Sequence, residues 1–314
     1  LLNTPAAAVR PVPGAPGPGA PAAARVPKRR PHVLREGAAR ALFGTAAALS
    51  IAAVALICLF LLANGVPAMA EIGLPEFLFG TTWRPVNDLY GIFPMIVGSL
   101  YVTAGAMIVG VPGGLLTALY FSRFARGRTG SFLRSGVELL AGIPSVVYGF
   151  FGLVIIVPFV RLLGPGTGLS VLAASLILGI MILPTVITVA QSALDAVPAR
   201  YYEGALALGV DHEHAVFKVV APAAASGIMA AIVLGLGRAI GETMAVVMVA
   251  GNMPIIPDSL LSGVRTMTAN IVLEMGYAAD LHREALIATG VVLFVFILLI
   301  TMLLNVIRKR GEAR

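Results

Sequence analysis

Long apolar runs recur along this chain, and charged residues gather in the short stretches between them. A bilayer core of about 30 Å is crossed by about 20 helical residues, because each residue of an α-helix adds about 1.5 Å. Every apolar run is at least that long. The pattern therefore predicts six membrane-spanning helices, at about residues 41–65, 93–121, 133–160, 169–193, 219–250 and 285–307.

The composition excludes a soluble domain. Of the 314 residues, 58% are hydrophobic and only 12% are charged, whereas soluble domains carry about 25% charged residues. The formal net charge of +7 arises from short basic runs beside the apolar stretches, so it does not indicate nucleic-acid binding. Cys58 is the only cysteine, which excludes an internal disulfide and a cysteine metal site. We expect an all-α integral membrane protein with six transmembrane helices.

Basic clusters set the predicted topology, because Lys and Arg beside a span stay on the cytoplasmic side. One cluster precedes the first span and another, Arg308–Arg310, follows the last, so both termini are expected in the cytoplasm. Residues 1–31 are rich in Pro, Ala and Gly and are predicted to form a disordered tail. They lack the apolar core of a signal peptide. Residues 32–314 form the membrane domain.

Two features of the outer side follow from the same pattern. Residues 259–275 predict a short amphipathic helix lying on the outer surface, because Arg265, Asn270 and Glu274 interrupt the apolar positions. Aromatic residues in the loop after the first span are expected at the membrane interface. These residues are Trp83 and Tyr90.

The third span is expected to bend. Pro144 lies inside it, flanked by Gly142 and Gly149. Proline removes an intrahelical hydrogen bond, and membrane helices tolerate this where neighbouring helices or water satisfy the freed groups. The fifth span, by contrast, is predicted to be one long helix.

The fifth span carries a charged pair near its centre. Arg238 follows Pro222 by about 24 Å of helix, and Glu242 lies four residues further on. Residues at this spacing share a helix face, so the two side chains are predicted to pair. Each such charge costs about 2.5–3.5 kcal/mol at mid-membrane, and ionisable residues there usually mark a transport path. A pair that only locks two helices is the alternative.

A polar loop at residues 198–218 joins the fourth and fifth spans. Residues 199–208 predict a short helix that ends at Gly209. Asp211 is placed to cap a second helix leading into the fifth span. Two short helices joined at a glycine form a compact projection on the cytoplasmic side, which we call the knob (residues 198–218). A purely structural helical hairpin remains the alternative.

The knob resembles the EAA loop of bacterial ABC importer permeases of type I, the MetI-like fold. Glu203-Gly204-Ala205, then Gly209, Val219 and Pro222 match its spacing, while Gly204, Val219 and Ala221 depart from its usual residues. The resemblance implies a permease that docks on a separate ATPase, which binds ATP and magnesium. This chain has no phosphate-loop motif, and we expect no catalytic residue and no bound cofactor in it. The implied ATPase-coupling residues are Tyr202, Glu203, Gly204, Ala205, Leu208 and Gly209.

Other segments resemble the PstC-type permease of the phosphate-specific importer. They are residues 142–152, residues 237–246 with Gly251-Asn252, and the stretch from Trp83 to Pro94. The resemblance covers the chain from about residue 40 onward. It implies phosphate as substrate and the bacterial plasma (inner) membrane as location. The implied partners are a PstA-type permease, two PstB-type ATPase subunits and a PstS-type binding protein.

A guanidinium matches two oxygens of phosphate, so Arg238 is predicted to contact the anion. We expect phosphate to displace Glu242 from Arg238 in the open path, and the pair to re-form on release. Three alternatives remain: transport of another oxyanion such as sulfate or molybdate, an ATP-independent anion transporter, and a structural subunit.

His212 and His214 are two residues apart on a predicted helix, so they face different directions and no metal site is expected. The predicted path residues are Arg238, Glu242, Ser145, Tyr148, Thr243 and Asn252.

Overall fold

The computed structural model describes residues 33–125 and 127–312, so the predicted tail at residues 1–31 lies outside the described residues. The chain divides into two units, Leu1–Ala55 and Leu56–Arg314. The described part of the first unit is the beginning of helix α1 (Val33–Ile72). The second unit holds the other helices and a small hairpin, in which β1 (Trp83–Arg84) pairs antiparallel with β2 (Leu89–Tyr90).

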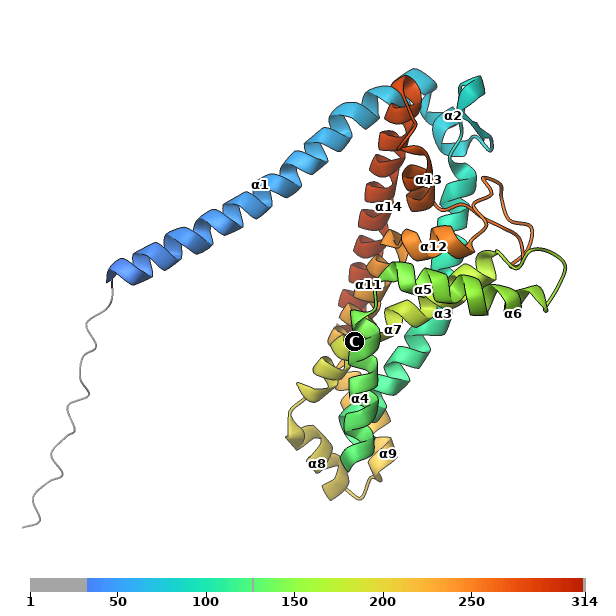
Figure 1. Ribbon diagram of the computed structural model, residues 1–314. Coiled ribbons are helices and arrows are strands. Elements are labelled where there is room, and N and C mark those ends of the chain that lie inside the picture. The colour runs from blue at the N-terminus through green and yellow to red at the C-terminus, as the bar shows by residue number, and fades with distance from the viewer. Residues whose placement is uncertain (1–32, 126, 313–314) are drawn as a thin grey trace, which may run out of the picture. The chain divides into compact units, whose positions relative to one another are not determined.

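Helices account for most of the second unit (Figure 1). Three of the segments have π-helical hydrogen bonding and are η2 (Tyr120–Phe124), η3 (Gly152–Ile156) and η4 (Val216–Val220), and the short 3-10 turn η1 (Pro85–Asn87) lies within the hairpin. The α-helices are α2 (Leu74–Phe79), α3 (Phe93–Leu119), α4 (Gly127–Gly142), α5 (Ser145–Phe151), α6 (Val157–Arg161), α7 (Val171–Asp195), α8 (Ala199–Ala207), α9 (His212–Ala215), α10 (Ala221–Ala223), α11 (Ala225–Gly241), α12 (Met244–Val249), α13 (Met267–Glu274) and α14 (Asp280–Glu312).

Four helices of the described residues are long and apolar enough to cross a membrane: Ala39–Ile72, Phe93–Phe124, Val171–Asp195 and Asp280–Val306. Two bent pairs raise this number to six if each pair is counted as one span. The first, second, fourth and sixth predicted spans are therefore confirmed as single helices. The third and fifth are broken.

The predicted bend in the third span is confirmed. Helix α4 ends at Gly142, Pro144 is extended (φ −61°, ψ 144°), and α5 starts at Ser145. The helices on the two sides of this break differ in direction by 101°. Proline disfavours helical geometry in the residue before it, which explains why the helix stops here. The Tyr148 hydroxyl donates to the Leu140 carbonyl at 2.7 Å, which also accepts the Ile143 N–H at 3.3 Å.

The prediction that residues 219–250 form one helix is wrong. Residues His212–Ala223 and α11 differ in direction by 71°. At its other end α11 stops at Gly241, Glu242 is extended (φ −69°, ψ 136°), and α12 begins at Met244. Glycine lowers helix stability by about 1 kcal/mol relative to alanine, so Gly237 and Gly241 weaken the last turn of α11.

Helix α7 is the centre of the packed core, with α3 and α11 against it. Ile177, Leu178 and Ile182 on α7 are fully buried. Glycine allows α3 and α7 to approach closely: a Cβ on Gly110 would lie 2.7 Å from the Gly179 carbonyl oxygen. Small residues at such contacts are typical of helices that associate inside a membrane.

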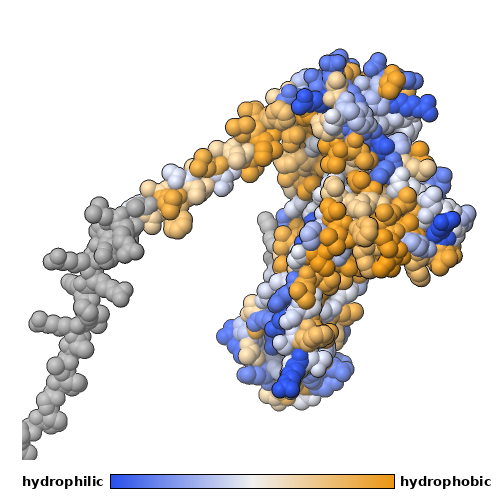
Figure 2. Space-filling model, viewed as in Figure 1, coloured by the Kyte–Doolittle hydropathy of each residue, from blue (hydrophilic) through white to orange (hydrophobic). Residues whose placement is uncertain are grey.

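The two ends of the second unit are polar, and hydrophobic side chains gather between them (Figure 2). Helix α2, the hairpin, α13 and the start of α14 lie at one end, and α8 and α9 lie at the other (Figure 1). Trp83 and Tyr90, which were predicted to lie at the membrane interface, pack inside the protein, where they are only 5% and 3% exposed. The predicted surface helix at residues 259–275 is wrong. The helix is limited to α13, and Asn270 and Glu274 on it are buried.

Candidate functional site

Arg238 lies in the last turn of α11 and is half-buried. Its Nη1 donates to the Thr185 hydroxyl on α7 at 3.2 Å. Thr185 follows Pro184, which lies inside α7. The C-terminal end of a helix carries partial negative charge and favours a cation, by about 0.3–1 kcal/mol. The position of Arg238 at the end of α11 therefore stabilises its charge.

The predicted pair between Arg238 and Glu242 is not formed. Within residues 33–125 and 127–312, the ion pairs closer than 4.0 Å involve Arg265, Glu274, Asp211 and two histidines, and neither member of the predicted pair. The reason is local backbone geometry. Spacing of four residues brings side chains together only within a continuous helix, and Glu242 lies in extended backbone beyond the end of α11.

Glu242 instead organises the break between α11 and α12. Its Oε1 accepts the backbone N–H of Ala245 at 3.3 Å, so the carboxylate caps the start of α12. Its backbone carbonyl accepts the hydroxyl of Thr268, on α13, at 3.0 Å. Thr243 turns back on the chain, because its hydroxyl donates to the Gly241 carbonyl at 3.3 Å.

Asn252 closes the other end of this region. Its backbone has φ +53°, and its Nδ2 donates to the Val247 carbonyl at 2.7 Å. Its own carbonyl accepts Nε of Arg265 at 2.9 Å. We call residues 242–252 the break segment. It contains α12 and is held at one end by Glu242 and at the other by Asn252.

Helix α5 packs against the break segment. A Cβ on Gly149 of α5 would lie 3.0 Å from the Cα of Ala245, so the two backbones are close. Tyr148 belongs to the same buried cluster as Ala239 and Ala245. Ser145, the first residue of α5, is half-buried. The structure thus brings α5 beside the residues that follow Arg238, although the Tyr148 hydroxyl already bonds to Leu140.

The arrangement is suited to binding an anion. A guanidinium has five N–H donors in a fixed fork. Within the described residues, Arg238 makes one hydrogen bond, to Thr185. Because Glu242 is engaged with α12, no carboxylate neutralises Arg238 there. The same part of the chain has no group of three or more His, Cys, Asp or Glu residues that could hold a metal ion. The polar chemistry at the break is therefore that of a single cation with spare donors.

The knob has the predicted two-helix form. Helix α8 ends at Ala207, Gly209 takes a positive φ of 84°, and the Asp211 carboxylate caps α9 by accepting the His214 N–H at 3.2 Å. Ala205 is buried against the rest of the knob, and Leu208 is 86% exposed. Three other residues of the implied docking surface are also exposed, namely Glu203, Gly204 and Gly209.

Tyr202 is half-buried and, like Ala205, faces inward. Its hydroxyl lies 2.7 Å from Nδ1 of His212 on α9. The guanidinium of Arg123, at the end of the second span, lies over its ring at 5.8 Å from the centroid. Arg123 also donates to the Leu194 carbonyl of α7 at 2.9 Å. Tyr202 therefore fastens the knob to two spans, and its hydroxyl is not part of an open docking surface.

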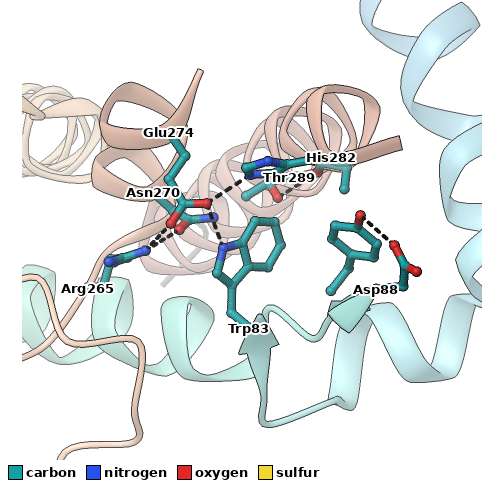
Figure 3. Close-up of polar contacts among 9 residues, drawn as sticks. Trp83, Asp88, Arg265, Asn270, Glu274, His282 and Thr289 are labelled. Carbon is teal, nitrogen blue, oxygen red and sulfur yellow. Dashed lines mark hydrogen bonds and ion pairs between the residues drawn. The ribbon is translucent and has the colours of Figure 1, made fainter. Parts of the chain in front are cut away.

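Sequence reasoning missed a buried polar network at the opposite end of the second unit (Figure 3). The Glu274 carboxylate accepts hydrogen bonds from Arg265 at 2.6 Å and from Trp83 at 2.9 Å, and Nε2 of His282 lies 2.9 Å from it. Arg265 also donates to Asn270 at 3.0 Å. The spacing of four between Asn270 and Glu274 places both on one helix face, and this was the signal in the sequence.

The chain is similar to known membrane transport proteins. Residues 110–312 match the family described as binding-protein-dependent transport system inner membrane component. The protein named "Probable ABC transporter permease protein YqgH" from Bacillus subtilis (strain 168) is 35% identical over 91% of this chain and 95% of its own length. The phosphate transport system permease protein PstC of Mesorhizobium japonicum is 33% identical over 82% of this chain and 85% of its own.

The fold is also found among solved structures. An inward-facing structure of the MetNI methionine ABC transporter contains a chain that superposes with a TM-score of 0.56 at 20% identity. The match covers 73% of this chain and 99% of that chain. At this level of identity the similarity concerns the fold.

Proposed function

The chain belongs to the family of binding-protein-dependent transport system inner membrane components, and from this premise we propose that it is a permease subunit of an ATP-driven phosphate importer. Its fold is that of a MetI-type ABC importer permease, and its relatives are membrane permease subunits rather than enzymes. Phosphate as the substrate is our proposal, which is supported by the PstC proteins among the relatives.

The observation that carries the proposal is the state of Arg238. It lies at the end of an apolar helix, bonds to Thr185 only, and has no carboxylate within ion-pair distance among the described residues. A buried charge of this kind is disfavoured in a membrane unless it has a use. A phosphate ion offers two oxygens in the geometry of the guanidinium fork. We infer that Arg238 contacts the anion as it passes.

Glu242 has a different role from the one that the sequence suggested. In this structure the carboxylate caps α12 and leaves Arg238 available for an anion. Movement of Glu242 toward Arg238 would require the cap on α12 to break. We propose that the path alternates between these two arrangements, so that Arg238 binds phosphate in one and is neutralised by Glu242 in the other. Ser145, Tyr148, Thr243 and Asn252 are the other proposed path residues.

The exposed residues of the knob are proposed to dock on a separate ATPase. The remaining proposed partners are a second permease of the PstA type, two ATPase subunits of the PstB type that bind ATP and magnesium, and a PstS-type binding protein. The chain is then a multi-pass protein of the bacterial inner membrane. Both termini and the knob face the cytoplasm in this proposal.

Other oxyanions are the nearest alternative, because Arg238 would also accept sulfate or molybdate. Competition of phosphate uptake by each of these anions separates the possibilities. If sulfate competes as well as phosphate, the proposed selectivity is wrong. An ATP-independent anion transporter is the other alternative, and uptake that persists without ATP would favour it.

The direct test is phosphate uptake by the assembled complex carrying Arg238→Gln. Hydrogen bonds to a charged group contribute about 1.5–3 kcal/mol, and about 1.4 kcal/mol corresponds to a factor of ten. Uptake should therefore fall at least about tenfold. Arg238→Lys keeps the charge but loses the planar fork of donors, so its uptake should lie between that of the wild type and that of Arg238→Gln. Thr185→Val is the matched control, since it removes the partner of Arg238 and leaves the guanidinium. Unchanged uptake by Arg238→Gln would contradict the proposal.

A further inference from the structure

The network around Glu274 joins four separate parts of the second unit (Figure 3). Glu274 lies at the end of α13, Trp83 on the hairpin, His282 in the first turn of α14, and Arg265 in the loop before α13. Trp83 and Glu274 are 191 positions apart in the sequence. The Glu274 side chain is 9% exposed, so a single buried carboxylate connects these elements.

Stability alone does not explain this network. Apolar side chains surround it, among them Met95, Met267 and Leu286, which are fully buried. Replacing a buried charged group and its partners by well-packed apolar residues often leaves a protein equally or more stable. Buried charges that persist in an apolar core are therefore candidates for a positional role.

Helix α13 and the loop before it contact both ends of the break segment. At one end, the Thr268 hydroxyl of α13 donates to the Glu242 carbonyl at 3.0 Å. At the other end, Arg265 donates through Nε to the Asn252 carbonyl at 2.9 Å, while its Nη1 bonds to Glu274 at 2.6 Å. The position of α13 thus determines where α12, between Glu242 and Asn252, can lie.

The junction between Arg265 and the break segment is incompletely satisfied. Oδ1 of Asn252 and Nδ2 of Asn270 are buried and have no hydrogen-bond partner within residues 33–125 and 127–312. Arg265 contacts both residues, through the Asn252 carbonyl and through Oδ1 of Asn270. An acceptor and a donor are therefore left unpaired on residues that one guanidinium bridges. Most buried polar groups in folded proteins are hydrogen-bonded, so these two atoms are exceptions.

We propose that Glu274 is a positioning residue for transport. Through Arg265 it holds the Asn252 end of the break segment, and through Trp83 and His282 it connects that segment to the outer face. Docking of an extracytoplasmic binding protein on the hairpin and the start of α14 then shifts α12 and the residues after Arg238. The proposal rests on the proposed function, which supplies the binding protein, the outer face and the anion path at Arg238.

The test uses the complete complex with both permeases, the ATPase and the binding protein, and compares wild type with Glu274→Gln. The glutamine keeps the size of the side chain and removes the charge that Arg265 contacts. We expect stimulation of ATP hydrolysis by the binding protein to fall at least tenfold, while basal hydrolysis stays within twofold of wild type. Hydrogen exchange of the amides at residues 244–252 should become at least tenfold faster, with exchange in the knob unchanged.

Two further variants make the result specific. Trp83→Phe removes one donor to Glu274 and keeps an aromatic ring, so it should give a smaller change in the same direction. Asp258→Asn is the matched control: Asp258 is an exposed carboxylate in the loop before α13 and is not among the partners of Glu274. It should leave stimulation and exchange unchanged.

Several outcomes would overturn the proposal. Wild-type stimulation and exchange in Glu274→Gln would do so, and an equal fall in basal and stimulated hydrolysis would reduce Glu274 to a structural residue. If Glu274→Gln does not assemble, normal stimulation and exchange in Trp83→Phe would also contradict the proposal. Exchange at residues 244–252 requires no substrate, so it tests Glu274 even if phosphate fails to stimulate the wild-type complex and the proposed function is wrong.

Discussion

At the residue scale, the chemistry of the candidate path depends on which group each charged side chain contacts. Arg238 and Glu242 have the spacing of a helical ion pair, but the structure separates them and gives each another partner, Thr185 and the Ala245 N–H. Spare donors on Arg238 are what make it a candidate for phosphate. The same dependence on backbone geometry is seen in the knob, where two glycines occupy different conformations.

Gly204 and Gly209 provide a matched pair of substitutions. Gly204 lies within α8, and a Cβ there would meet nothing within 4 Å, so Gly204→Ala should stabilise the helix by about 1 kcal/mol. Gly209 has φ +84°, and a left-handed conformation costs other residues about 1–2 kcal/mol, so Gly209→Ala should destabilise the knob. Hydrogen exchange of the α8 amides measures both changes. Equal effects of the two substitutions would contradict this account of the knob.

At the element scale, two short helices decide the geometry beside Arg238. Helix α5 follows the bend at Pro144, and α12 follows the break at Glu242. They pack on one another through Gly149, whose Cβ would lie 2.7 Å from Sδ of Met248 and 3.0 Å from the Ala245 Cα. The absence of a side chain at Gly149 therefore fixes how close α5 and α12 lie.

A methyl group at this contact should separate the two helices. Overpacking costs about 1–3 kcal/mol, which exceeds the gain of about 1 kcal/mol from replacing a helical glycine by alanine. Gly149→Ala should therefore lower the thermal midpoint of the purified complex and reduce phosphate uptake. Gly136→Ala on α4 is the control, because a Cβ there meets nothing within 4 Å. A higher midpoint for Gly149→Ala would show that the contact is looser than the structure indicates.

The sequence predicted those elements that depend on local pattern. Four spans, the bend at Pro144 and the capped helices of the knob follow from apolar periodicity, proline geometry and capping residues. The break at Glu242 was not predicted, because Gly237 and Gly241 only weaken the helix there and apolar residues resume at Met244. It is held by contacts with residues far along the chain, such as Thr268. The buried position of Glu274 has the same origin, since its partner Trp83 comes from the loop after the first span.

At the scale of the whole molecule, the knob and the hairpin, the two proposed docking regions, lie at opposite ends of the second unit, with α11 and the break segment between them (Figure 1). The knob at one end exposes Glu203 and Leu208, and the hairpin at the other connects to Glu274. A transporter driven by a cytoplasmic ATPase and supplied by an external binding protein requires this separation. The central claim is that both ends act on one anion path at Arg238.

Changes at the knob should uncouple the ATPase without changing the path. Glu203→Ala combined with Leu208→Asp removes an exposed charge and places a carboxylate where an exposed apolar side chain stands. We expect co-purification of the ATPase to fall at least about tenfold, because apolar contacts at the centre of an interface dominate its affinity. Asp258→Ala, an exposed change in the outer loop, should have no effect. Normal recovery of the ATPase with the double variant would exclude the knob as the docking site.

Phosphate-stimulated ATP hydrolysis by the complete complex in liposomes tests the central claim most directly. The account predicts that phosphate-loaded binding protein raises hydrolysis several-fold over the unloaded protein. The Arg238→Gln complex should still hydrolyse ATP. It should deliver phosphate to the lumen at no more than about one-tenth of the wild-type rate. Phosphate delivery by Arg238→Gln at the wild-type rate, or hydrolysis that is indifferent to phosphate, would contradict it.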